Sequence, residues 1–142
     1  MSGAKIFNVS EIVKLNDKIS EISDKYIELM GDIITNADEK TAEEKFENLK
    51  ANYPMLHQEI KEQMQKLSVL NPVAELVNVH TQLTALFDKL DDDSNRMTNS
   101  LEIDYFLADL GHLFGAIKRQ QYSVEEIQSI TQKLVYDLTD GI

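Results

Sequence analysis

The apolar residues of this chain recur with the spacing of α-helices almost throughout. The first stripe advances in alternating steps of three and four residues: Ile12, Leu15, Ile19, Ile22, Tyr26, Leu29 and Ile33. These steps form an a/d heptad seam, which is typical of helices that cross at a shallow angle. The spacing predicts a first helix that begins after Ser10, with residues 1–9 flexible. The same seam fits either the core of a bundle or the interface of a homodimer.

A second apolar stripe passes through a proline. It consists of Phe46, Leu49, Tyr53, Leu56, Ile60 and Leu67, and residues 41–44 before it have the sequence of a capping box. An interior proline normally breaks or kinks a helix. Because the apolar spacing keeps one phase on both sides of Pro54, we expect a kinked but continuous helix that ends near Leu70.

The remaining helices are predicted from three more patterns. Asn71 and Pro72 indicate a stop and a restart, with Asn71 as the N-cap and proline at the first helical position. The next stripe is Val73, Leu76, His80, Leu83, Phe87 and Leu90. Residues 91–100 are polar and form the longest predicted connector. A fourth helix is expected from about Ser100 to Gln120, and a fifth from the capping box at residues 123–126 to about Gly141.

These elements predict an all-α protein. Alternation typical of strands is absent, and the 142 residues fit one domain spanning residues 1–142. Too few residues follow Ser100 to build a second core. Short connectors favour antiparallel neighbours, so we expect an up-and-down bundle of four to five helices.

Composition narrows the classes of function. Without cysteine, the chain has no disulfide, thiolate metal ligand or cysteine nucleophile, and this composition fits a reducing compartment. The net charge is −11, and only Arg96 and Arg119 among the fourteen basic residues are arginine. Nucleic-acid binders need clustered basic residues, and a membrane span needs about 20 apolar residues. With no secretory signal in evidence, we expect a soluble, cytoplasmic protein that binds neither nucleic acid nor membrane.

An acidic segment has the spacing of a calcium loop. In residues 91–102, side-chain oxygens fall at the first, third, fifth, ninth and twelfth positions: Asp91, Asp93, Asn95, Asn99 and Glu102. A calcium loop of the EF-hand type needs oxygens at those positions. Arg96 departs from the pattern, because it stands where glycine makes the sharp turn. A solvated acidic connector explains the same residues with fewer assumptions.

The histidines offer weaker candidates for a metal or catalytic site. His80 lies on an apolar stripe, where a core histidine with one hydrogen bond is the simpler interpretation. Asp109 and His112 are three residues apart, but a di-metal bundle needs two such motifs and two further carboxylates. His57 has no evident partner other than Glu59. No established catalytic or phosphate-binding motif is present in the sequence.

Two glycines lie inside a predicted helix. Gly111 and Gly115, with Ala108 and His112 beside them, have the spacing that allows a second backbone to come close. Each glycine costs about 1 kcal/mol relative to alanine, so a close approach is expected to compensate. The approaching backbone belongs either to this bundle, which needs no further assumption, or to a partner or second copy.

Three functions follow from these features. The first is a non-enzymatic protein-interaction module, such as an adaptor, chaperone, inhibitor or immunity protein, which acts through a helical face and needs no cofactor. Its partner is another protein, and a homodimer is one form of this hypothesis. The second is a calcium-binding protein that uses residues 91–102. The third is an enzyme with a site in the bundle core formed by His80, Asp109 and His112.

Overall fold

The computed structural model describes residues 3–35, 39–101 and 110–140. Its elements are the four long helices α1 (Gly3–Thr35), α2 (Glu39–Val69), α3 (Val77–Ser100) and α4 (Leu110–Asp140), with a short 3-10 helix η1 (Ala74–Leu76) before α3. No strand occurs in these three described ranges. The prediction of an all-α fold is confirmed.

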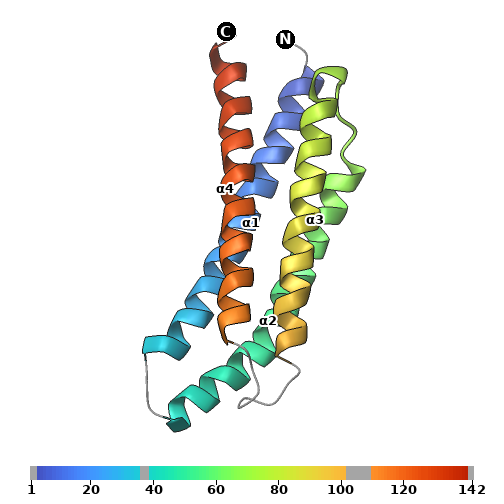
Figure 1. Cartoon of the computed structure of the whole chain (residues 1–142). Helices are drawn as coiled ribbons and strands as arrows, with labels where there is room; N and C mark the ends of the chain where they lie inside the picture. Colours follow the sequence, from blue (N-terminus) through green and yellow to red (C-terminus); the bar gives the residue numbers. More distant parts are fainter. Residues whose placement is uncertain (1–2, 36–38, 102–109, 141–142) are drawn as a thin grey trace.

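The four helices form an up-and-down bundle. Each helix packs against the next one along the chain, and α4 also packs against α1, which closes the ring. The two ends of the chain lie at the same end of the bundle (Figure 1). Among the described helices, each long one carries too many polar and charged residues to cross a bilayer.

The predicted apolar stripes face the interior. The buried residues of α1 include Ile12, Leu15, Ile19, Ile22 and Tyr26, and they pack with the stripes of α2 and α3 in one core. The Tyr26 and Tyr53 rings meet at a centroid distance of 4.6 Å. Fully burying one large apolar side chain contributes about 1.5–3 kcal/mol, so these stripes dominate stability. From Ile12 to Tyr26 the seam of α1 is therefore part of the bundle core. The alternative that these residues form the interface of a homodimer is wrong.

The N-terminal residues are helical from Gly3 onwards, so the prediction that the first helix begins after Ser10 is wrong. Asn8 and Val9 are buried, with 4% and 3% of their surfaces exposed. The Asn8 Oδ1 accepts a hydrogen bond of 2.9 Å from the Val73 N–H, and its Nδ2 donates to the Asn71 carbonyl at 3.3 Å. These contacts are tertiary, so the local apolar spacing did not reveal them.

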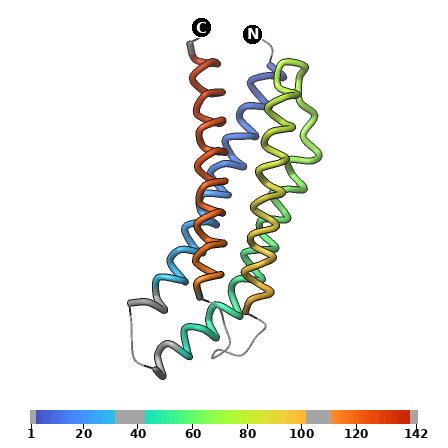
Figure 2. Tube along the Cα trace, in the orientation of Figure 1, coloured from blue at the N-terminus to red at the C-terminus, as the bar shows by residue number. Residues whose placement is uncertain are grey.

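The helix through Pro54 is continuous, as predicted. Pro54 lies inside α2, and its side chain is exposed. Figure 2 shows that the early, teal part of α2 is inclined relative to the later, green part. The helix begins at Glu39, so Thr41 lies in its first turn and is not the residue that starts it.

The connector between α2 and α3 is longer than expected. The predicted stop near Leu70 is confirmed, because α2 ends at Val69. The predicted restart at Pro72 is wrong, since Val73 is extended, with φ −62° and ψ 158°, and α3 begins only after η1. The hydrogen bond from the Val73 N–H to Asn8 holds the backbone in this form.

Two segments that were predicted to connect helices lie within helices. Residues 91–100 belong to α3, and residues 121–123 belong to α4, so the predicted fourth and fifth helices are one helix over the described range. The physical reason is that buried polar residues continue the apolar stripes. Ser94 lies between the buried Leu90 and Met97, and Gln120 occupies the corresponding place in α4.

Candidate functional site

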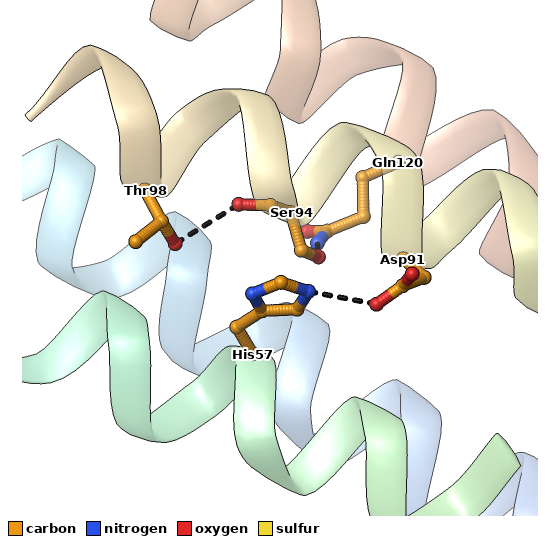
Figure 3. Close-up of polar contacts among 5 residues, drawn as sticks. All are labelled: His57, Asp91, Ser94, Thr98 and Gln120. Atoms are coloured by element: carbon orange, nitrogen blue, oxygen red, sulfur yellow. Dashed lines mark hydrogen bonds and ion pairs between the residues drawn. The ribbon is translucent and has the colours of Figure 1, made fainter.

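All four helices contribute polar side chains to one layer in the bundle core. This polar layer consists of Tyr26 from α1, His57 from α2, Asp91 and Ser94 from α3, and Gln120 from α4. The His57 Nε2 lies 2.7 Å from the Asp91 Oδ1, and the Gln120 Nε2 donates a hydrogen bond of 3.1 Å to the Ser94 Oγ (Figure 3). The layer therefore joins α2 to α3 and α3 to α4 through polar contacts.

The polar layer contains serine, histidine and aspartate but is not a catalytic triad. In a triad the nucleophile binds one histidine nitrogen while the carboxylate holds the other. Here Asp91 holds the His57 Nε2, and no hydrogen bond joins Ser94 to His57. The Ser94 hydroxyl receives the Gln120 amide instead, and Ser94 is 0% exposed, so a substrate does not reach it.

Two groups in the polar layer have no hydrogen-bond partner among the residues that the structure describes. They are the Tyr26 hydroxyl and the Gln120 Oε1, which are both buried. Burial raises the pKa of Tyr26 to about 12, although the nearby Ser94 hydroxyl lowers it in part. An unpaired buried polar group costs stability. The layer thus combines satisfied and unsatisfied polar groups in the bundle core.

The predicted calcium loop does not form. Asp91, Asp93, Asn95 and Asn99 all lie on α3, and Glu102 lies outside the described residues. Asn95 and Asn99 are exposed, whereas Asp91 contacts His57 and Asp93 contacts Arg119. A helix does not wrap oxygens around an ion as the EF-hand loop does. Within the described part of the chain, no three His, Asp or Glu side chains gather in a form that could hold a metal.

The histidines proposed for a site in the bundle core are not brought together. The His80 Nε2 lies 2.8 Å from the Leu67 carbonyl oxygen near the end of α2, as expected for a core histidine with one hydrogen bond. His112 is exposed in the first turn of α4, and Asp109 lies outside the described residues. Since α3 and α4 start at opposite ends of the bundle, His80 and His112 are far apart (Figure 1).

The glycines of α4 lie on its outer side. Gly111 is exposed and Gly115 is half-buried. A Cβ atom at Gly115 would have the Arg119 Nη1 as its nearest neighbour, 3.4 Å away, and it would meet no backbone of a neighbouring helix. The prediction of close packing inside the bundle is therefore wrong for Gly115. Ala108, the third small residue of this group, lies outside the described residues.

A groove between α3 and α4 brings the two arginines together. This arginine groove has a volume of about 360 Å³, and its lining includes Lys89, Asp93, Arg96, Arg119, Tyr122 and Ser123. The Arg119 Nε donates a hydrogen bond of 3.1 Å to the Asp93 Oδ1, and the Arg96 Nη1 lies 4.0 Å from the same oxygen. This groove was not predicted from the sequence, because residues 91–100 were expected to form a connector between helices.

No protein-family model, curated protein or solved structure matches the chain. The function is therefore inferred from the surface and the groove alone.

Proposed function

We propose that the chain is a non-enzymatic protein-interaction module that binds a partner protein through the outer side of α4. The observation that carries this proposal is the exposure of large apolar side chains on that helix: Phe114, Tyr122, Val135 and Tyr136. Tyr122 and Tyr136 are 58% and 65% exposed. Tyrosine supplies a large, amphipathic contact surface and is enriched in protein interfaces. Adaptors, chaperones, inhibitors and immunity proteins all act by covering a partner's surface in this way.

The spacing along α4 places two of these residues, Tyr122 and Tyr136, in one stripe. The outer stripe consists of Gly111, Gly115, Lys118, Tyr122, Ser129 and Tyr136. Successive members are separated by multiples of three to four residues, so they share one side of the helix. The glycines form a shallow end of the stripe where a partner's backbone has room, and the tyrosines form its protruding part. This shape suits an extended contact with a helix or loop of another protein.

The alternative functions have less support. The enzyme hypothesis placed His80 and His112 in one site, and they lie at opposite ends of the bundle. The calcium hypothesis required a loop at residues 91–102, and the described part of this segment is helical up to Ser100. Neither observation affects an interaction through the outer stripe.

Affinity capture from the native host tests the proposal. The immobilised chain is compared with Tyr122→Ser/Tyr136→Ser and with the control Met55→Ser/Val69→Ser, which changes equally exposed residues on α2. We expect a defined protein to bind the wild type and the control but not the α4 variant. Retention of the same protein by the α4 variant, with its fold verified by circular dichroism, would contradict the proposal. Size-exclusion chromatography of the three proteins reveals whether the partner is a second copy.

A further inference from the structure

We infer that the arginine groove binds a carboxylate on an acidic segment of the partner protein. The inference rests on the proposed function, since the groove borders the outer stripe of α4 at Tyr122. The inference specifies which chemical group of the partner enters the groove.

The first support is the geometry of Arg119. Asp93 has only 8% of its side chain exposed, and its Oδ1 accepts the Arg119 Nε–H. A guanidinium fixed at its Nε keeps two terminal nitrogens, which match the two oxygens of a carboxylate. Arg119 forms no other hydrogen bond in the described part of the chain, and 47% of its side chain is exposed. The Asp93 carboxylate thus orients Arg119 for a second oxyanion.

The second support is the position of Ser123 in the same groove. Ser123 lines the groove, and its hydroxyl can donate a hydrogen bond to an oxyanion. Ser123 lies one turn after Arg119, so both side chains are on the same side of α4. An oxyanion held by Arg119 is therefore positioned to accept the Ser123 hydroxyl proton as well.

The third support is the charge on the facing wall. Lys89 and Arg96 are seven residues apart on α3, and both line the groove. The carboxylates of Asp92, Asp93 and Glu126 also lie in the lining, so its three positive charges are balanced by three negative ones. The chain as a whole carries −11. The groove is thus less negative than the chain as a whole, and Lys89 and Arg96 are the groups on this wall that can pair with a carboxylate.

Gly115 adjoins the Arg119 guanidinium, and Tyr122 lines the groove. The nearest neighbour of a Cβ at Gly115 would be the Arg119 Nη1, at the ordinary contact distance of 3.4 Å, so alanine would fit there and a side chain as large as leucine would crowd the guanidinium. The exposed ring of Tyr122 offers an apolar contact for the residue next to the bound carboxylate. The expected ligand is therefore an acidic residue beside an apolar one.

The test is an NMR titration of the full ¹⁵N-labelled chain. The probe is a short capped peptide of alternating glutamate and leucine, and the matched peptide has glutamine in place of glutamate. We expect the acidic peptide to shift the amide signals of Gly115 and Ser123, and the glutamine peptide to leave them unchanged. Inorganic phosphate at the same concentration distinguishes a free phosphate ligand.

The variant Lys89→Gln/Arg96→Gln removes two exposed charges from the groove, and Lys61→Gln/Lys66→Gln removes two from α2 as the control. Binding of the acidic peptide should weaken about tenfold in the groove variant, as expected for lost charge-assisted contacts, and should persist in the control. Circular dichroism verifies that both variants fold. Gly115→Leu, which leaves every charge in place, should weaken binding by displacing Arg119.

The inference is overturned if the acidic peptide shifts signals on another surface or none, if the control loses as much binding as the groove variant, or if phosphate binds as well as the peptide. These outcomes are distinct from failure of the proposed function. That failure is seen when the tyrosine variant of α4 still captures the partner. A partner that is lost with the tyrosines but retained by Lys89→Gln/Arg96→Gln sustains the proposed function and contradicts the carboxylate site.

Discussion

Asn8→Ala removes the side chain that ties the start of α1 to the connector between α2 and α3. Asn8 is 4% exposed and forms two hydrogen bonds with that connector, at 2.9 Å to the Val73 N–H and at 3.3 Å to the Asn71 carbonyl. Alanine keeps the helix but leaves both backbone groups without this partner. The variant therefore measures how strongly the connector depends on the N-terminal turns of α1.

The expected loss follows from the exposure of the two backbone groups. Asn71 is exposed, so water can replace the lost hydrogen bond to its carbonyl. Val73 is half-buried, and an unsatisfied buried N–H costs about 1–3 kcal/mol. For a domain of this size each kcal/mol lowers the melting temperature by roughly 3 °C. The melting temperature should thus fall by about 3–9 °C.

Thermal unfolding followed by circular dichroism measures this change. Ser10→Ala is the matched control, because Ser10 is exposed two residues further along α1, and it should have little effect. Asn8→Asp keeps an acceptor for the Val73 N–H but buries a carboxylate that faces the Asn71 carbonyl oxygen, so it should lose at least as much stability as alanine. Deletion of residues 1–9 also removes the buried Val9 and should destabilise the most. If the deletion and Asn8→Ala both leave the melting temperature unchanged, the segment is flexible in solution and the structural argument fails.

Three further predictions concern the core and the proline inside α2. Ser94→Ala should lower the free energy of unfolding in urea by about 1–3 kcal/mol, because the Gln120 amide loses its acceptor, whereas Ser94→Ala with Gln120→Leu should recover that loss. Burial raises the pKa of Tyr26 to about 12. The stability that the protonated Tyr26 contributes to the folded state is therefore fully present below the unfolded pKa near 10, and it is lost as the pH rises towards 12. The melting temperature should therefore fall over that range, and less steeply for Tyr26→Phe; an equal slope would contradict this assignment. Pro54→Ala should raise the melting temperature, because Pro54 is exposed inside α2 and alanine restores a backbone hydrogen bond; a decrease would show that the core needs the proline's geometry.

The stripes that the sequence predicts well are those made only of apolar residues. The seam of α1 from Ile12 to Tyr26 and the stripe on both sides of Pro54 are buried as expected. Their period depends on the helix alone, so it is visible without knowledge of tertiary contacts. The start of α1 was missed because it depends on a tertiary contact. Asn8 is buried through a hydrogen bond with a connector that follows some sixty residues later.

The helix ends misplaced within α3 and α4 have one common cause, which is polar residues at core positions. In α3 the buried residues Leu90, Ser94 and Met97 follow steps of four and three. In α4 the buried Gln120 and Val124 continue the same alternation. When only one sequence is read, a polar residue at such a position looks like the end of a helix. A search for the three-and-four spacing that tolerates one polar residue per stripe would have continued both helices.

The capping box at residues 123–126 shows the complementary error. Its serine and glutamate match the pattern of a helix start. In the structure Ser123 lies in the middle of α4, where it lines the arginine groove. The same two residue types suit a helix terminus or a polar groove, and the local sequence does not distinguish them.

The contacts of the candidate site were beyond local reasoning. His57 and Asp91 are 34 residues apart, and Asp93 and Arg119 are 26 apart. Such pairs are predictable only once the register between neighbouring helices is known. From the sequence alone, the acidic residues were a candidate calcium site or a solvated connector. Their partners in the structure, a histidine and an arginine, lie on other helices.

A single turn of α3 connects the core to the proposed binding surface. Asp91 contacts His57 on α2, whereas Asp93 contacts Arg119 and Ser94 contacts Gln120, both on α4. Polar contacts of this kind cost stability relative to an apolar core but can specify one register between helices. On this hypothesis the turn fixes the height of α4 against α3, and with it the position of Arg119 in its groove. The Ser94→Ala/Gln120→Leu variant separates the two effects: it should keep its stability, while a shifted α4 would alter the NMR signals of Gly115 and Ser123.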